Sequence, residues 1–144
     1  MPMQYSSEGQ QLTKGFESCR LVAYQDSKGV WTDGWGHTRG VKEGDTCTQA
    51  QADAWLLEDV QEAVDAVNRL VTAPLTQHQF DALVDFCFNV GQGNFASSTM
   101  LRLLNAGDYE AADQQFARWD VCGGVHLYGL ARRRAGEANE FEEA

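Results

Sequence analysis

The stretch GFESCRLVAYQDSKGVWTDGWGHT, residues 15–38, is where the helical spacing of apolar residues breaks down. It sets Val, Tyr, Trp and Thr between two turn signals, Ser27-Lys28-Gly29 and Asp33-Gly34. That pattern predicts a small antiparallel sheet of two or three strands. Because so few strands are unstable alone in water, we expect the sheet to pack on helices.

Capping signals and apolar spacing predict helices on both sides of this stretch. A first short helix is expected at Ser7, whose capping box Gln10 completes, and a long helix is expected from Thr48 to about Val71. The same signals predict further helices opening at Thr76 and covering about residues 98–105, 108–119 and 130–141.

One early β-patch in a helical chain predicts an α+β domain with two lobes, a small antiparallel sheet lobe and a larger helical lobe. At 144 residues the chain has the length of one domain. We expect the first helix and β-lobe over about 1–50, a connecting helix over about 51–71, and the helical lobe over about 72–144. A cleft between lobes is a common ligand site.

The composition narrows the class of function. A net charge of -10 argues against a nucleic-acid binder, because phosphate attraction needs clustered Lys and Arg, and Arg132-Arg133-Arg134 is the main basic cluster. The sequence holds no apolar run of the length that a signal peptide or membrane anchor needs, which predicts no membrane insertion.

The cysteines Cys19, Cys47, Cys87 and Cys122 lack metal-ligand spacing and are sparse for a disulfide scaffold. Cys87 lies on an apolar helical stripe, which favours a buried free thiol. We therefore expect reduced, structural cysteines, with neither a metal nor a cofactor.

Two acids and a hydroxyl are candidates for catalysis. Glu17 ends the first helix, Asp26 precedes the turn of the hairpin, and Thr32 lies on the returning strand. Such a set can place a proton donor and a water-activating carboxylate across one cleft, as glycoside hydrolysis requires. The alternative is ordinary surface charge, since the chain has 21 acidic residues.

The sequence LVAYQDSKGVWTDGWGHT at residues 21–38, following Glu17, resembles the pattern L-x-A-Y-x-D-x-x-G-x-x-T-x-G-x-G-H-T of phage-type lysozymes (glycoside hydrolase family 24). The resemblance continues through LTQHQFDALVDFCFNVG and RWDVCGGVHLYGLARRRAGE, and covers about Ser6 to Phe141. It implies a lysozyme-like fold and an endolysin that hydrolyses the β-1,4 bond between N-acetylmuramic acid and N-acetylglucosamine in peptidoglycan, lysing the host.

By this resemblance Glu17 is the general acid, while Asp26 with Thr32 positions and activates water, with inversion at the sugar. A lytic transglycosylase, which needs no water, and a non-catalytic peptidoglycan-binding module on the same fold are the alternatives. Desolvation of the acid and a wetter place for the base would separate their pKa values.

Supporting roles are expected for Arg133 and His37. Arg133 matches the first Arg of the family's R-R pair and is expected to pair with Glu17, the alternative being a solvated helix charge or a partner of a helix C-terminal dipole. His37 is expected to pair structurally with Glu58 or Asp59 rather than to bind a metal.

Phe88, Trp35 and Thr38 are candidate substrate contacts. Phe88 matches a family position that lines the glycan cleft, the alternative being a core residue. Trp35, like Trp31, is expected either to stack on a sugar ring or to cover the core, and Thr38 follows His37 in the family pattern.

Asp33 departs from the family pattern, which usually has an aliphatic residue there. If its side chain points inward, burying an unpaired carboxylate costs several kcal/mol or forces it to take up a proton. We therefore expect either that a basic partner meets Asp33 or that the local strand differs from that of the family.

The expected partner is bacterial peptidoglycan, with no nucleic acid and no membrane insertion. We expect a monomer that is made in the host cytoplasm and acts on the periplasmic wall after a separate holin-type pore has permeabilised the membrane.

Overall fold

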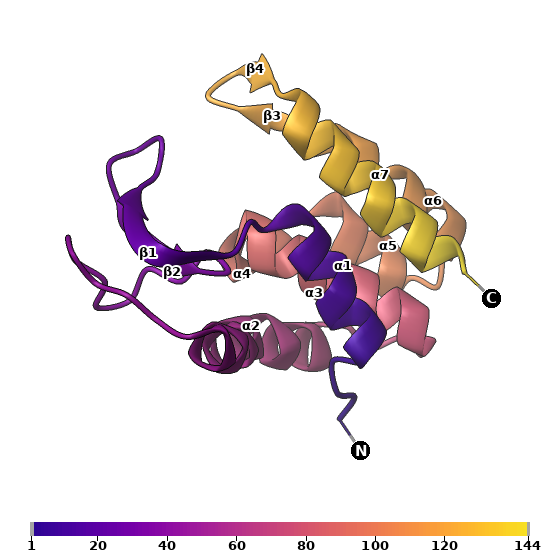
Figure 1. Cartoon of the computed structure of the whole chain (residues 1–144). Coiled ribbons are helices and arrows are strands. Elements are labelled where there is room, and N and C mark those ends of the chain that lie inside the picture. Colours follow the sequence, from indigo (N-terminus) through magenta and orange to yellow (C-terminus); the bar gives the residue numbers. More distant parts are fainter. Residues whose placement is uncertain (1, 144) are drawn as a thin grey trace. The chain divides into compact units, whose positions relative to one another are not determined.

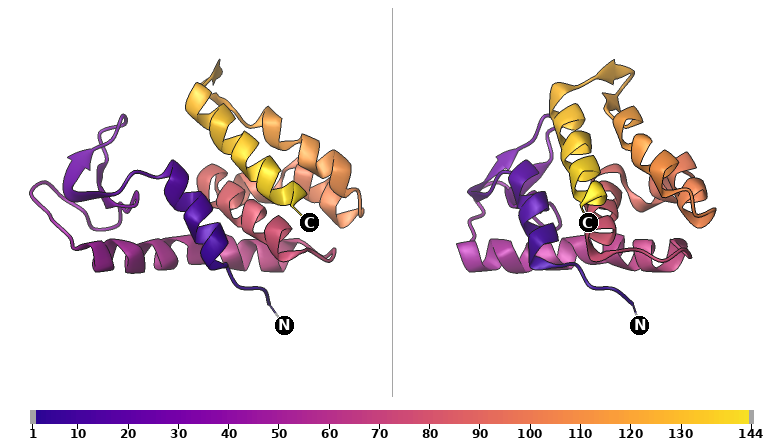
Figure 2. Two further views of the ribbon diagram at one scale, coloured as in Figure 1. Left: turned by 45° about the vertical axis from the view of Figure 1, so that its right-hand side comes forward. Right: turned by 90° about the vertical axis from the view of Figure 1, so that its right-hand side faces the viewer.

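The computed structural model describes residues 2–143 of the chain. These residues form two compact units. The smaller unit is Thr13–Gln61, and the larger combines Met1–Leu12 with Glu62–Ala144. Helices α1 (Ser7–Phe16) and α2 (Gln49–Leu70) each contribute residues to both units (Figures 1 and 2).

The smaller unit contains an antiparallel hairpin of β1 (Arg20–Gln25) and β2 (Trp31–Gly34). Tyr24 lies opposite Thr32, and Gln25 lies opposite Trp31. A single bridge between Val22 and Thr46 extends the pairing on the outer side of β1. The predicted antiparallel sheet is confirmed, and it has two strands with a third segment attached by one bridge.

Helix α2 covers this hairpin unit with its first turns. It begins where the sequence predicts, because the hydroxyl of Thr48 accepts a hydrogen bond from the backbone N–H of Gln51 at 3.1 Å. Its buried face in this unit consists of Ala52, Leu56 and Val60.

Helix α1 begins at Ser7, but its cap differs from the prediction. The hydroxyl of Ser6 accepts a hydrogen bond from the N–H of Gly9 at 3.0 Å, so the cap lies one residue before the expected Ser7. Ser6 also donates its hydroxyl proton to the carboxylate of Asp81. This contact with a residue far along the chain selects Ser6 over its neighbour.

The larger unit is built around α3 (Gln77–Val90), whose residues 80–87 are all buried. The predicted capping box of Thr76 and Gln79 is present at its start. In the core, Phe86 meets the rings of Phe95 and Phe116 edge-on at centroid distances of 6.2 and 5.4 Å, a favourable geometry for aromatic pairs.

Other elements surround α3 and pack against one another, and α7 runs beside it in all three views (Figures 1 and 2). They are α4 (Gln92–Ala96), α5 (Thr99–Asn105), α6 (Tyr109–Gln114), a 3-10 turn at Phe116–Arg118, β3 (Val121–Cys122), β4 (Val125–His126) and α7 (Tyr128–Glu142).

Several predictions of helix boundaries need correction. The helix expected over 108–119 ends at Gln114 and continues as a 3-10 turn, and the last helix starts at Tyr128 rather than at residue 130. Helix α4 and the small hairpin β3–β4 were not predicted. Both are too short to give a periodic apolar pattern.

No helix within residues 2–143 combines the length and the apolar character needed to cross a membrane.

All four cysteines are free thiols. Cys87 lies on α3 with 1% of its surface exposed, whereas Cys122 on β3 is exposed. Burial raises the pKa of the Cys87 thiol to about 11, with only partial opposition from Arg69. The expected buried free thiol at Cys87 is therefore confirmed.

This difference predicts the order in which the thiols react. At pH 8, the exposed Cys122 should react quickly with a disulfide reagent, while Cys87 should stay protected, because it is buried and a pKa near 11 leaves only about 0.1% of its thiol as thiolate. The measurement is thiol titration of the folded and the denatured protein, with Cys87→Ser as control. Rapid labelling of Cys87 in the folded protein would contradict the burial.

Candidate active site

Glu17 directly follows α1, and its N–H donates to the carbonyl of Thr13 at 3.0 Å, continuing the helical pattern. Its side chain is half-buried. The backbone of Gly36 approaches its carboxyl group so closely that a Cβ on Gly36 would lie 2.9 Å from Oε2 of Glu17. Gly36 also has a φ of 85°, a conformation that favours glycine. Sequence reasoning did not single out Gly36, although the G-H-T signal contains it.

Asp26 lies at the turn between β1 and β2. Its Oδ1 accepts hydrogen bonds from the N–H groups of Lys28 at 2.8 Å and Val30 at 2.9 Å. Its own N–H donates to the carbonyl of Val30 at 2.9 Å. Short polar side chains commonly close turns in this way, and here the bonds hold the carboxylate in one orientation.

Thr32 and Asp26 share one face of the hairpin. Thr32 lies opposite Tyr24, and Asp26 is two residues beyond Tyr24, so the pleat directs the three side chains to the same side. The Thr32 hydroxyl donates its proton to the carbonyl of Val30 at 2.9 Å, which leaves its oxygen able to accept. Their joint role in holding a water molecule stays a prediction.

His37 is a buried structural residue of the smaller unit. Its Nδ1 lies 2.8 Å from Oδ2 of Asp59, and its ring stacks on Trp55 with centroids 4.3 Å apart. Of the two expected partners, Asp59 is the one that His37 contacts, while Glu58 is exposed. The pair fastens the segment after β2 to α2.

Trp35 is also joined to α2. Its Nε1 donates to Oδ1 of Asp53 at 2.8 Å, and Nζ of Lys14 lies 5.4 Å from the ring centroid. The hydrogen bond from Trp35 is the largest contribution that lowers the pKa of Asp53, followed by one from Gln49. These contacts give Trp35 an anchoring role, and its stacking on a sugar stays a prediction.

Two further candidates occupy accessible positions. Thr38 is exposed immediately after His37, and Phe88 is half-buried near the end of α3, at the edge of the run 80–87 that forms the core. Their contacts with a glycan stay predictions.

Arg133 is 5% exposed and forms a two-pronged ion pair with Asp85. Its Nε lies 3.0 Å from Oδ2, and its Nη2 lies 2.8 Å from Oδ1. The alternative of a solvated helix charge is therefore wrong. The expected pair of Arg133 with Glu17 would join the two units, and it stays a prediction.

The pair belongs to a buried polar network that sequence reasoning missed. Arg134 Nε lies 2.7 Å from Oε1 of Glu137, and Arg134 Nη2 donates to Asn89 at 2.8 Å. Burial, together with Asp85, raises the pKa of Glu137 well above its usual value, while Arg134 and Arg133 oppose the rise. The sequence feature that could have indicated this network is Asp85, a charged residue among the apolar residues of α3.

Asp33 points inward, with 1% of its surface exposed, and its Oδ1 has no hydrogen-bond partner within residues 2–143. Burial raises the pKa of its carboxyl, the charge of Asp45 adds to the rise, and His37 opposes it. The carboxyl of Asp33 therefore keeps its proton to a higher pH than an ordinary aspartate does.

The phage lysozyme family matches residues 14–137, which include the whole hairpin and the segments that bear Phe88 and Arg133. The chain belongs to the phage lysozyme family. It is 42% identical to an endolysin of Acyrthosiphon pisum secondary endosymbiont phage 1, over 99% of this chain and 100% of that one. It is 43% identical to the endolysin of Salmonella phage P22, over 92% of this chain and 94% of that protein.

A solved structure extends the likeness to three dimensions. The muramidase domain of SpmX from Asticaccaulis excentricus superposes with a TM-score of 0.92 at 43% identity, covering 98% of this chain and 99% of that one. The expected lysozyme-like α+β fold is thus confirmed. Family membership makes the chain an endolysin-type peptidoglycan hydrolase.

The contact between Gly36 and Glu17 predicts a loss of activity in Gly36→Ala. A methyl group at 2.9 Å must displace the Glu17 carboxyl, and a displacement of about 1 Å can lower the rate about 100-fold. The control is Gly40→Ala, because Gly40 also has a positive φ, 74°, yet its Cβ would meet nothing within 4 Å in the described residues. The measurement is wall hydrolysis beside Tm. Equal activity in the two variants would contradict this role.

The raised pKa of Asp33 predicts a pH-dependent stability. A carboxyl whose folded pKa exceeds its unfolded value stabilises the fold fully below the unfolded value, and this contribution is lost as pH rises through the folded pKa. Asp33→Asn, which does not titrate, should therefore exceed the wild type in Tm by a few degrees at pH 8 but not at pH 4.

Thermal unfolding at both pH values measures this, with Glu43→Gln as control, since it removes one exposed acid from the same unit. A Tm difference that is independent of pH would show that the pKa of Asp33 is not raised in the folded protein.

Proposed function

We propose that this chain is a muramidase that hydrolyses the β-1,4 bond between N-acetylmuramic acid and N-acetylglucosamine in peptidoglycan. The observation that carries the proposal is the shared hairpin face of Asp26 and Thr32 in a unit where Glu17 follows α1. A glycosidase of this kind needs one proton donor and one carboxylate that activates water.

Glu17 acts as the general acid. It gives a proton to the glycosidic oxygen as the bond to the anomeric carbon breaks. The close approach of Gly36 supports this role, because it restricts the position of the carboxyl from which the proton leaves. Pre-positioning of this kind removes an entropic part of the barrier.

Asp26 and Thr32 hold the attacking water. The Thr32 hydroxyl already gives its proton to Val30, so it can only accept a hydrogen bond from the water. The Asp26 carboxylate accepts the other water proton. With both protons held, a lone pair of the water oxygen is directed to the anomeric carbon on the face opposite the leaving group, which inverts its configuration.

A lytic transglycosylase is the alternative reaction, in which the muramic acid's own hydroxyl replaces water and an anhydro product forms. Asp26 and Thr32 favour hydrolysis, because the transglycosylase reaction has no water to position. We assign Phe88, Trp35 and Thr38 to glycan contacts and Arg133 to the orientation of Glu17.

We propose further that the protein lyses a phage-infected cell from within. It is made in the host cytoplasm and reaches the periplasmic wall as a monomer after a separate holin-type pore has opened the membrane. The net charge of -10 makes long-range attraction to an anionic wall unfavourable, so recognition depends on local contacts.

Glu17→Gln should lower the clearing of permeabilised Gram-negative cells about 100- to 10,000-fold, the range that a general acid contributes. Asp26→Asn should lower it as well, because the amide no longer activates water. Glu62→Gln, an exposed acid on α2, is the control. Turbidity measures the rate, and mass spectrometry of the released fragments should find reducing ends rather than anhydro-muramic ends.

Three other results would each contradict part of the proposal. A folded Glu17→Gln protein that still clears cells would refute the assigned acid. Anhydro products would establish the transglycosylase. Binding to peptidoglycan without release of fragments would establish a non-catalytic module.

A further inference from the structure

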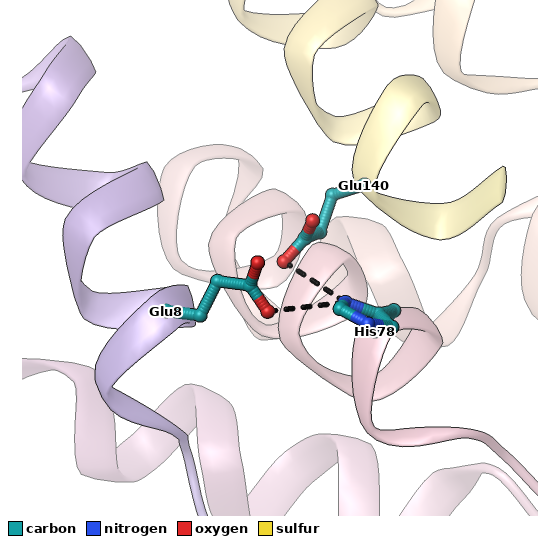
Figure 3. Close-up of side chains that lie close together, drawn as sticks. All are labelled: Glu8, His78 and Glu140. Carbon is teal, nitrogen blue, oxygen red and sulfur yellow. Dashed lines mark ion pairs between the residues drawn. The ribbon is translucent and has the colours of Figure 1, made fainter. Parts of the chain in front are cut away.

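Outside the catalytic region, Glu8, His78 and Glu140 form a cluster on the larger unit (Figure 3). Glu8 belongs to the first turn of α1, His78 to the first turn of α3 and Glu140 to the end of α7. Nδ1 of His78 lies 3.2 Å from Oε2 of Glu8 and 3.5 Å from Oε1 of Glu140.

We propose that this cluster is a binding site for a divalent transition metal ion, with Zn²⁺ as the best match. One imidazole and two carboxylates are a usual Zn²⁺ ligand set. The ligand atoms of all three residues lie within 4.8 Å of one another.

The distances suit tetrahedral coordination. Metal–ligand bonds of about 2.0 Å place neighbouring ligand atoms about 3.3 Å apart. The two distances from His78, 3.2 and 3.5 Å, already lie near this value. The exposed side chain of Glu8 can rotate to complete the set, because 62% of it is accessible to solvent. A water molecule would fill the fourth position.

The more buried ligand atoms have unmet bonding capacity. Both Nδ1 of His78 and Oε1 of Glu140 are buried, and within residues 2–143 neither makes a hydrogen bond of good geometry, although Nδ1 forms ion pairs with Glu8 and Glu140. The contact at 3.5 Å is an ion pair too long for a strong hydrogen bond. Buried polar atoms without such bonds are rare in folded proteins and call for an explanation.

The local charge favours a cation at this position. Burial alone would lower the pKa of His78, but the polar contact with Glu140 and the charges of Glu8, Glu140 and Glu143 outweigh it, and the pKa is raised. The carboxylates of Glu8 and Glu140 therefore favour a positive charge at this site. A bound metal ion would supply that charge, and the imidazole of His78 would then be neutral.

The neighbouring Asp81 does not compete for the metal. It already accepts hydrogen bonds from the backbone and hydroxyl of Ser6 and from Gln77. A bound metal would thus join α1, α3 and α7 through Glu8, His78 and Glu140. It would fix the first turn of the helix that Glu17 follows.

The test is thermal unfolding and calorimetric titration of the full chain, without an affinity tag, with ZnCl₂ or CoCl₂. We expect one ion per chain and a Tm rise of about 5 °C at saturation. Visible absorption of the Co²⁺ form should indicate tetrahedral coordination. MgCl₂ and CaCl₂ should give no comparable rise, because these ions prefer sites made of oxygen atoms.

His78→Gln and Glu8→Gln should each weaken Zn²⁺ binding at least about tenfold. Two controls should keep it. His126→Gln removes an exposed histidine that contacts Asp120 at 2.8 Å, a pair without a third ligand in the described residues. Cys122→Ser removes the exposed thiol.

Failure of the wild type to bind Zn²⁺, or binding that is unchanged in the two ligand variants, would overturn the proposal. Loss of binding in Cys122→Ser would place the metal at the thiol instead. Glu8→Gln decides the matter if His78→Gln does not fold, because the Glu8 side chain is mostly exposed and contributes little to packing.

Discussion

The smaller unit depends on one constraint: a hairpin of two strands cannot bury a core of its own. Specific side-chain contacts with α2 supply what the sheet lacks. His37 pairs with Asp59, and Trp35 donates a hydrogen bond to Asp53. Where the hairpin meets α2, Gly34 has a φ of 56° and its Cβ would lie 3.2 Å from Cβ of Ala52, so a larger residue would separate the two elements. The candidate residues Asp26 and Thr32 lie on a small sheet that is held in place by these contacts with α2.

In the larger unit, charged side chains are buried in the core. Asp85 and Arg133 are removed from water almost completely, and their desolvation is offset by two parallel hydrogen bonds. Such a pair tolerates little displacement, so it fixes the position of α7 along α3. The aromatic core around Phe86 gives these helices stability, whereas the ion pair specifies how they are aligned.

The sequence predicted best those features that are local along the chain. Thr48 and the Thr76–Gln79 box cap their helices as expected, because a cap involves only residues three positions apart. The sequence also predicted the turn after Asp26 and the position of Thr32 on the second strand, since hairpins form between neighbouring segments. The prediction at Ser7 was wrong by one residue because the distant Asp81 binds Ser6. The very short elements α4, β3 and β4 have too few residues for any periodic signal.

By itself the sequence determined the α+β class, the starts of α2 and α3 and the early hairpin, because propensity, capping and turn chemistry act over a few neighbouring residues. Only the tertiary structure decided which acid His37 meets, that Arg133 is buried against Asp85, and that Asp33 faces inward with no hydrogen-bond partner for its Oδ1 within residues 2–143. It also brought Glu8, His78 and Glu140 together from three helices. These outcomes depend on desolvation and on distances between remote segments, and both exist only once the chain has packed.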